Sequence, residues 1–299
     1  MKKRQLTLSA TAAALALLTL SACSGSASGD GPGSGSGGHG NKASGEVAIS
    51  HIHGVGIGPS DGKLYVATHD GIYTPGQGTT PTLVGERKDD FMGFTITPTG
   101  SFLASGHPAP GRDAPNNLGL IESTDTGRTW KDRSLTGEVD FHSLEYAHKT
   151  IYGYDSTNGL LRVSEDGTNW EKRAKLRTLD IAVSPQDPDT VLASTESGIS
   201  RSTDGGRTFA KGAEPLLAFV SWPTADALYG IDPSGQVSRS TDGGANWQRT
   251  GTAPGGQPQA LTAIDAQRLI AATQDGVYES KDGGKTFTKR LAVTSGGDH

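Results

Sequence analysis

The sequence predicts an all-β fold and, within that class, a single β-propeller. The chain has 299 residues with 43 glycines and only 33% hydrophobic residues, and its body shows no long helical apolar stripe. This composition favours many short strands joined by turns. A short phrase also recurs, and the serines that open it are residues 123, 164, 202, 240 and 280, at intervals of 41, 38, 38 and 40. Such a period is typical of propeller blades or helical repeats. Each unit contains strand-type runs such as VLASTESGIS (191–200) and no helix-length pattern, which favours the propeller over helical repeats.

Residues 1–23 are predicted to be a lipoprotein signal peptide. A basic start, Met1 to Arg4, precedes an apolar run over 6–20 that is short for a membrane-spanning helix. The run ends in Leu-Ser-Ala-Cys at 20–23, and Cys23 is the only cysteine of the chain. This ending resembles a bacterial lipobox, which implies that Cys23 is lipidated. An ordinary secretory signal is the alternative.

The remainder divides into a tether, one domain and a tail. Residues 24–45 are rich in Gly and Ser and are expected to be a flexible tether. The propeller is expected over 46–293, followed by a disordered tail over 294–299. We therefore expect the chain in the bacterial cell envelope, either held by the lipid on Cys23 at the outer face of the cytoplasmic membrane or exported.

Six innermost strands are predicted, one for each blade. They are expected at 51–57, 90–96, 140–146, 179–185, 217–223 and 260–266. The repeated phrase accompanies five of these blades and is missing from the first. A seventh blade built from degenerate segments remains an alternative.

The repeated phrase, Ser-x-Asp-x-Gly-x-x-Trp/Phe, is predicted to form a turn stabilised by its own side chains. The aspartate accepts hydrogen bonds from nearby backbone N–H groups, the glycine adopts a positive φ, and the aromatic ring covers the sheet. All three roles are structural. The aspartates concerned are Asp125, Asp166, Asp204, Asp242 and Asp282.

The phrase resembles the Asp-box, or BNR repeat, of sialidases and many other propellers. In that family the box lies between the third and fourth strands of a blade, on the side away from the binding face. The resemblance therefore implies a fold and an orientation rather than an activity.

Sialidase chemistry is not expected. The family would imply three converging arginines, a tyrosine nucleophile and an Arg-Ile-Pro stretch, but the chain has no Arg-Ile-Pro and its predicted inner strands contain no arginine. Another glycoside hydrolase would need two facing carboxylates, for which Asp90, Asp140 and Asp180 are the candidates. The alternative is that these acids bind water or backbone donors at the channel mouth.

Histidines concentrate in the first three blades. Three aligned inner strands begin HIHG, DFMG and DFHS, and residues two apart lie on the same side of a strand. Two further histidines end second strands, which brings them to the rim opposite the Asp-boxes. The group predicted to gather there is His51, His53, His69, Met92, His107 and His142.

This group predicts a transition-metal site. Imidazole suits zinc and copper, and the sulfur of Met92 would favour copper. The Pro/Gly/Asn-rich segment 107–118 supports the choice of rim, because long loops on rigid scaffolds tend to carry binding. Histidines bonded to backbone groups, or a polar pocket for an organic ligand, are the alternatives.

The domain also resembles a group of small bacterial lipoproteins that carry HxHG, a GHPAPG-like loop and a DFH strand, here at 51–54, 106–111 and 140–142. Members are often labelled glycosyl hydrolases. We expect a monomeric binding protein rather than an enzyme, with copper or zinc as its ion. A glycan-acting or glycan-binding protein and a scaffold for another envelope protein are the alternatives. The net charge of −5 indicates no nucleic-acid partner.

Overall fold

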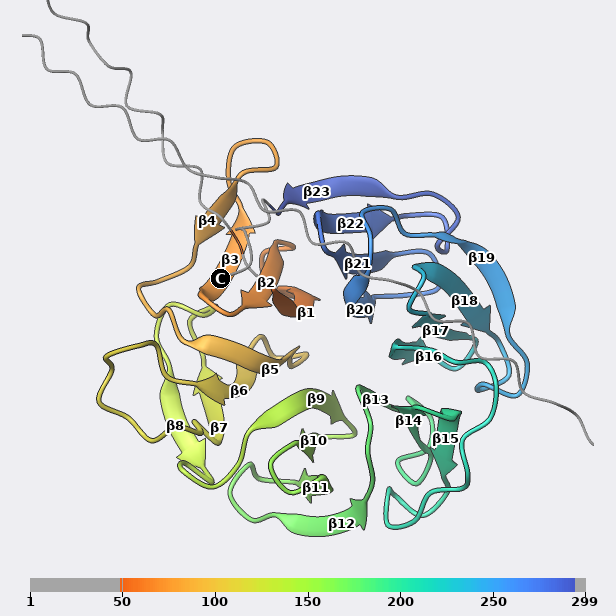
Figure 1. Cartoon of the computed structure of the whole chain (residues 1–299), viewed down its shortest axis with the longest axis horizontal. Coiled ribbons are helices and arrows are strands. Elements are labelled where there is room, and N and C mark those ends of the chain that lie inside the picture. The colour runs from red at the N-terminus through yellow and green to blue at the C-terminus, as the bar shows by residue number, and fades with distance from the viewer. Residues whose placement is uncertain (1–48, 50, 294–299) are drawn as a thin grey trace, which may run out of the picture. The chain divides into compact units, whose positions relative to one another are not determined.

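The structure, a computed structural model, describes Ile49 and residues 51–293. These residues form six antiparallel sheets arranged as a six-bladed β-propeller (Figure 1). The predicted fold class and blade number are confirmed, and residues 51–293 contain no seventh sheet. The signal peptide with Cys23, the tether and residues 294–299 lie outside the described residues. Within the described part of the chain, no helix is long and apolar enough to cross a membrane.

Each sheet is one blade, and its strands follow the chain outward from the centre of the ring (Figure 1). The innermost strands β1, β5, β9, β13, β16 and β20 each contact the next around the ring, and β20 contacts β1. Each of them overlaps one of the six predicted inner strands, and β5 has the predicted bounds. Blade 4 has three strands and one further bridge, between Ile199 and Ala213. The bounds are β1 Ile52–Ile57, β2 Leu64–Thr68, β3 Gly71–Pro75 and β4 Pro81–Leu83 in blade 1; β5 Asp90–Ile96, β6 Phe102–His107, β7 Leu120–Ser123 and β8 Lys131–Ser134 in blade 2; β9 Phe141–Ala147, β10 Thr150–Asp155, β11 Leu160–Ser164 and β12 Glu171–Lys175 in blade 3; β13 Ile181–Val183, β14 Val191–Thr195 and β15 Gly198–Ser202 in blade 4; β16 Phe219–Thr224, β17 Ala227–Ile231, β18 Gln236–Ser240 and β19 Gln248–Thr252 in blade 5; β20 Pro258–Ala263, β21 Leu269–Thr273, β22 Gly276–Ser280 and β23 Thr288–Ala292 in blade 6.

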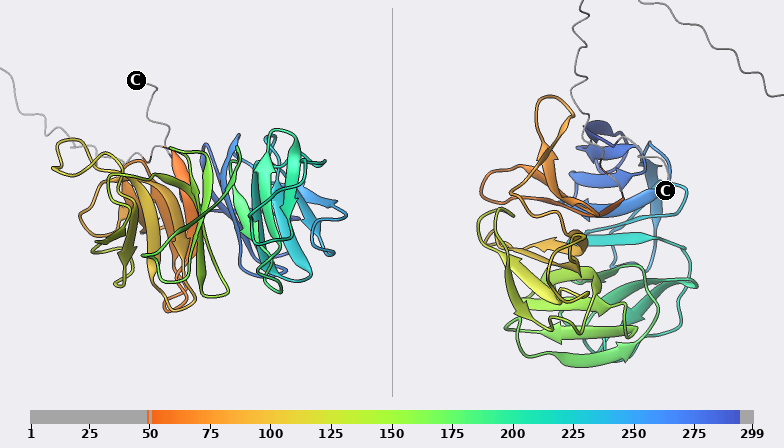
Figure 2. Two further views of the ribbon diagram at one scale, coloured as in Figure 1. Left: turned by 90° about the horizontal axis from the view of Figure 1, so that it is seen from below. Right: turned by 60° about the vertical axis from the view of Figure 1, so that its left-hand side comes forward.

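The hydrophobic core consists of layers between neighbouring blades. Tyr65 and Ile72 of blade 1 pack with Phe91, Phe94 and Phe102 of blade 2, and equivalent clusters follow around the ring. The strands lie edge-on between these layers in the side views (Figure 2). Because each blade buries both faces, its strands read as apolar runs of Val, Ile, Leu and Ala rather than as strict alternation.

The ring closes without exchanging a strand between its two ends. All four strands of blade 1 come from the beginning of the domain and all four of blade 6 from its end. Packing joins them: Ile52 and Val66 share one buried cluster with Ile270 and Leu291. The hydroxyl of Thr262 also donates to the carbonyl of Val55 at 2.7 Å. Closure therefore depends on apolar burial between the first and last blades.

The five repeated turns have the predicted internal bonding. In the copy at 202–209, the Ser202 hydroxyl donates to Asp204 Oδ1 at 2.7 Å, and Asp204 accepts from the Thr208 backbone N–H at 2.9 Å. Gly206 has a φ of +83° and its N–H donates to Ser202 Oγ at 2.8 Å. Each turn connects the third strand of its blade to the chain that follows at the outer edge. The turns thus mark one rim of the propeller and leave the opposite rim unrepeated.

Candidate functional site

On the rim opposite the repeated turns, each blade brings the entrance of its innermost strand against the exit of its second strand. Blades 1, 2 and 3 carry polar pairs at this equivalent position. In blade 2, β5 begins exactly opposite the end of β6 in the register. In blade 1 the backbone N–H of His69 donates to the carbonyl of His51 at 3.3 Å, and in blade 3 the backbone N–H of Ser156 donates to the carbonyl of Asp140 at 3.0 Å. The three pairs are His51 with His69, Asp90 with His107, and Asp140 with Ser156.

The first group of ligand atoms joins blade 1 to blade 2. His69 Nδ1 lies 2.9 Å from Asp90 Oδ2, and His53 Nε2 lies 3.5 Å from Asp90 Oδ1. The two imidazole nitrogens are 3.4 Å apart. One ligand atom from each of His53, His69 and Asp90 lies within 4.8 Å of the other two. We call these three residues the trio.

These separations suit one tetrahedral metal ion. With metal–nitrogen and metal–oxygen bonds of about 2.0–2.2 Å, the ligand atoms of a tetrahedral site lie roughly 3.3 Å apart. The separation of 3.4 Å between His53 Nε2 and His69 Nδ1 is close to that value, and these two nitrogens lie 3.5 Å and 2.9 Å from different oxygens of Asp90. Two imidazoles and a carboxylate would leave a fourth position open, and His69 is 43% exposed on the solvent side.

The electrostatics of the trio favour a neutral imidazole beside a carboxylate. Burial, with His69 as the next cause, lowers the pKa of His53 to about 3, so its ring is neutral near pH 7. Burial alone would raise the pKa of Asp90, but the hydrogen bond from His69 and the neighbouring imidazoles lower it. The hydrogen bond to Asp90 raises the pKa of His69. A neutral imidazole and an ionised carboxylate are the forms that bind a metal ion.

His51 lies beside the trio but is oriented differently. Its ring centroid is 4.9 Å from that of His53. The backbone N–H of Ile52 donates to Gln259 Oε1 at 3.0 Å, which directs the amide NH₂ of Gln259 to His51 Nδ1 at 3.2 Å. Since Nδ1 accepts this bond, the proton of the neutral His51 ring is on Nε2. His51 therefore lines the site without presenting a free ligand atom to the trio.

A second group surrounds Asp140 in blade 3. His142 Nε2 lies 2.6 Å and His107 Nε2 lies 3.4 Å from Asp140 Oδ2, and the Ser156 hydroxyl donates to the same oxygen at 3.2 Å. The Asp140 side chain is 5% exposed. Its other oxygen, Oδ1, is buried and has no hydrogen-bond partner among the described residues.

The long loop after β6 is fastened to the same rim. Asp89, which is fully buried, pairs with Arg87 and with Arg112 of the loop, and it accepts the backbone N–H of Ala109 at 2.9 Å. The loop in turn supplies a carbonyl, that of Asn116, 2.8 Å from His107 Nδ1. The loop therefore orients His107.

Gly106 is the backbone requirement for this arrangement. Its φ is +141°, and a Cβ at this position would lie 1.8 Å from the carbonyl oxygen of Asp90. Only glycine allows β6 to approach the start of β5 this closely. The GH pair in GHPAPG therefore places His107 next to Asp90.

Two other predicted site residues make different contacts. Met92 is half-buried in β5, at the bulge between Phe91 and Phe94, and is not among the residues lining the central channel. Asp180 accepts from the Ser143 hydroxyl at 2.8 Å and from the backbone N–H of Val220 at 3.0 Å, so it connects blades 3, 4 and 5. These contacts of Asp180 do not include a histidine of the trio.

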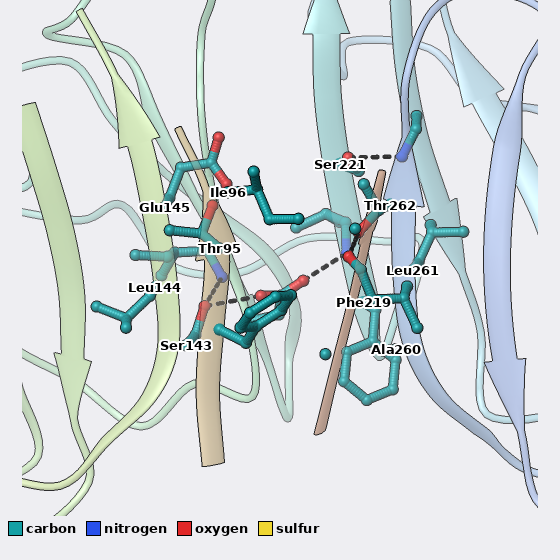
Figure 3. A pocket seen from close by; sticks show the side chains of 18 of the residues that line it. Thr95, Ile96, Ser143, Leu144, Glu145, Phe219, Ser221, Ala260, Leu261 and Thr262 are labelled. Atoms are coloured by element: carbon teal, nitrogen blue, oxygen red, sulfur yellow. Dashed lines mark hydrogen bonds between the residues drawn. The ribbon is translucent and has the colours of Figure 1, made fainter. Parts of the chain in front are cut away.

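The rim surrounds the mouth of a central channel of about 360 Å³, which His53 and His142 also line. Figure 3 shows Ser143 and Glu145 on one wall, and Phe219, Ser221 and Thr262 on the other. The accessible surface of Glu145 faces the channel. Burial, together with the charge of Asp180, raises the pKa of Glu145 to about 8. Burial also raises the pKa of Asp180 to about 6.

Sequence reasoning missed several contributors to the site. Gln259 belongs to blade 6, outside the region where the histidines cluster, and no local pattern connects it to His51. Glu145 follows the DFH motif on β9, so its alternation with Ser143 could have indicated a channel position. Asn116 acts through its backbone, which side-chain patterns do not reveal.

Comparison with known proteins gives one curated relative. No protein-family model matches the chain. The chain is 26% identical over 214 residues to a xyloglucanase from Paenibacillus sp, in an alignment that covers 67% of this chain and 20% of that protein. The chain thus spans about a fifth of the length of this relative.

Several solved structures are similar in fold. An ancestral GH74 enzyme superposes with a TM-score of 0.52 at 16% identity, covering 81% of this chain and 38% of that one. The extracellular domain of a putative hybrid two-component system from B. thetaiotaomicron superposes with a TM-score of 0.54 at 11% identity, covering 83% of this chain and 35% of that one. A chain of a nidogen/laminin complex superposes with a TM-score of 0.59 at 12% identity, covering 77% of this chain and 93% of that one. Together these similarities support a β-propeller fold.

Proposed function

We propose that this chain is a metal-binding propeller of the bacterial envelope, anchored through Cys23, with zinc or copper held at the rim of blades 1 and 2. The observation that carries the proposal is the convergence of His53 Nε2, His69 Nδ1 and an Asp90 oxygen within 4.8 Å. An N₂O donor set suits zinc and copper. The anchor and the location rest on the sequence of residues 1–23 alone.

The burial and charge of the trio support a binding role. The side chain of Asp90 is 22% exposed and that of His53 only 10%, yet no arginine or lysine pairs with Asp90 among the described residues. A half-buried carboxylate that faces only imidazoles is stabilised by a cation, which also uses the free lone pair of His53.

Zn²⁺ and Cu²⁺ titrations of the full chain test the proposal. We expect saturable binding that is lost in His53→Ala and His69→Ala but kept in His148→Ala. His148 is the matched control, because it lies in the turn between β9 and β10, at the other rim, where its ring contacts the carbonyl of Ser184. A chain that binds neither ion contradicts the proposal.

A glycan-acting role is the second candidate, and the similarity to a xyloglucanase favours it. A glycoside hydrolase needs one protonated carboxyl and one ionised carboxylate. The pKa of Asp90 is lowered, which does not suit the acid, whereas Glu145 and Asp180 in the channel have pKa values raised to about 8 and about 6. Under this candidate, the acid is a channel residue.

Xyloglucan oligosaccharides are the substrates for testing this candidate. Hydrolysis or saturable binding that is lost in both Glu145→Gln and Asp180→Asn supports it, with Asp90→Asn as the comparison variant. The absence of both hydrolysis and binding removes it. The scaffold interpretation stays a prediction.

A further inference from the structure

We propose that the rim holds a second metal ion, bound at Asp140 by His107 and His142, so that the propeller carries a pair of neighbouring sites. This inference rests on the proposed function, because it extends the site formed by His53, His69 and Asp90 into blade 3.

Asp140 is a buried carboxylate that no arginine or lysine pairs with among the described residues. Two other deeply buried carboxylates of the propeller have guanidinium partners: Asp155 pairs with Arg162 at 2.8 Å, and Glu279 pairs with Arg268 at 2.6 Å and with Arg290. Asp140 is almost as buried, but its ion-pair partners in the described part of the chain are two histidines only. A buried carboxylate without a permanent cation is costly unless something else supplies the positive charge.

The orientation of His107 leaves space for such a charge. Its Nδ1 lies 2.8 Å from the backbone carbonyl of Asn116 and must carry a proton to donate to it. In the neutral ring, Nε2 then presents a lone pair to Asp140 Oδ2 at 3.4 Å. Two lone pairs face each other at this distance favourably only with a proton or a metal ion between them. A backbone carbonyl that fixes the other ring nitrogen is also the usual support of a metal-binding histidine.

Asp140 has spare ligand capacity. Its Oδ2 accepts from His142 and Ser156, while Oδ1 is buried without a hydrogen-bond partner. Asp180, which also lacks an arginine, differs in this respect, because each of its oxygens accepts a hydrogen bond. The unused oxygen at Asp140 is a second, independent observation in favour of a cation site.

The two sites are neighbours but differ in readiness. His53 and His142 line the same central channel, and the strand register places His107 opposite Asp90. In the residues that the structure describes, only the first trio has every ligand atom within 4.8 Å of the others. His142 must therefore rotate to close around the second ion, while His107 keeps its contact with Asn116. The side chain of His142 is 39% exposed and has room to rotate. The second ion should accordingly bind more weakly than the first.

Titration of the full chain with Zn²⁺ alone, followed by calorimetry and by metal analysis after gel filtration, tests this inference. We expect two binding steps and about two ions per chain at saturation. In the double variant His107→Gln/His142→Gln, only the stronger step should remain, at about one ion per chain. Glutamine keeps the polar character of both positions, and thermal unfolding confirms that the variant is folded.

Each outcome separates the two proposals. No Zn²⁺ binding at all overturns the proposed function together with this inference. One ion per chain that the double variant leaves unchanged overturns only the second site. One ion per chain whose affinity falls in the double variant also overturns it, because His107 and His142 would then belong to the first site. If the double variant unfolds, the single variant Asp140→Asn, which keeps the shape of the side chain, must show the same loss of the weaker step.

Discussion

His69 Nδ1 lies 2.9 Å from Asp90 Oδ2, a contact that joins the exit of the second strand of blade 1 to the entrance of the first strand of blade 2. His53, from β1, completes the group: its Nε2 lies 3.4 Å from His69 Nδ1. Three separate strand ends thus deliver the three ligand atoms. Because neighbouring blades pack rigidly through buried aromatic and aliphatic side chains, the spacing is set by the fold rather than by a flexible loop.

Substitutions around the trio should have graded effects on Zn²⁺ affinity. We expect His53→Ala and His69→Ala each to weaken binding by more than about 100-fold, since loss of an outer-shell partner alone typically costs about 10–100-fold. His51→Ala should cost roughly 10-fold or less, because its Nδ1 is occupied by Gln259. Calorimetric titration measures all three. Equal losses in the three variants would show that His51 is a ligand.

Gly106→Ala should disturb the rim through the backbone. A methyl group there would meet the Asp90 carbonyl, and the φ of +141° disfavours any side chain. The expected destabilisation exceeds about 1 kcal/mol and is accompanied by weaker metal binding. Gly62→Ala is the matched control: its φ of +67° imposes the backbone strain, but no atom lies within 4 Å of the added group. Urea unfolding measures both, and equal effects would contradict the role of Gly106.

Substitution of a repeated turn should affect stability without affecting the site. In Asp204→Ala the backbone N–H groups of Arg207 and Thr208 lose their acceptor. We expect a lower thermal midpoint and unchanged Zn²⁺ affinity, because the turn lies at the opposite rim. A folded Asp204→Ala protein that no longer binds Zn²⁺ would contradict the assignment of this rim as structural.

Glu145 should make stability depend on pH. Its pKa is raised from 4.5 to about 8, so the folded protein retains a proton that the unfolded chain releases. Its contribution is therefore complete below about pH 4.5 and is lost as the pH rises to about 8. Glu145→Gln cannot ionise and should gain stability relative to the unsubstituted protein between pH 5 and 8. Asp180, the charged neighbour, is present in both proteins.

Urea unfolding at pH 5 and pH 8 measures this difference. Glu138→Gln, which removes an exposed glutamate, is the control and should show none. A constant difference between Glu145→Gln and the unsubstituted protein at both pH values would contradict the buried position of Glu145.

The sequence was sufficient for the architecture because the repeat carries redundant information. Each copy of the Ser-x-Asp phrase fixes one outer turn, and the spacing between copies leaves room for one four-stranded blade. DFMGFTI was predicted as an inner strand at 90–96, and β5 has the same bounds. The rim of the histidines also followed from sequence, because the position of the turns identifies the opposite end of every strand.

The partners of each histidine could not be derived in this way. His142 and Asp140 were expected to face one side of a strand, but the sequence did not show that Asp140 would be buried and His142 exposed. That difference depends on Ser156 and on packing between blades. The bulge at Met92 and the contacts of Asp180 across three blades likewise depend on the tertiary fold.

Metal analysis of the full chain, purified after incubation with Zn²⁺ or Cu²⁺ and compared with His53→Ala, is the decisive test of metal binding at the rim. We predict retained, chelator-removable metal in the unsubstituted protein and its loss from the site of His53, His69 and Asp90 in the variant, with both proteins unfolding cooperatively. Equal metal content in the two proteins, or none in either, would contradict it.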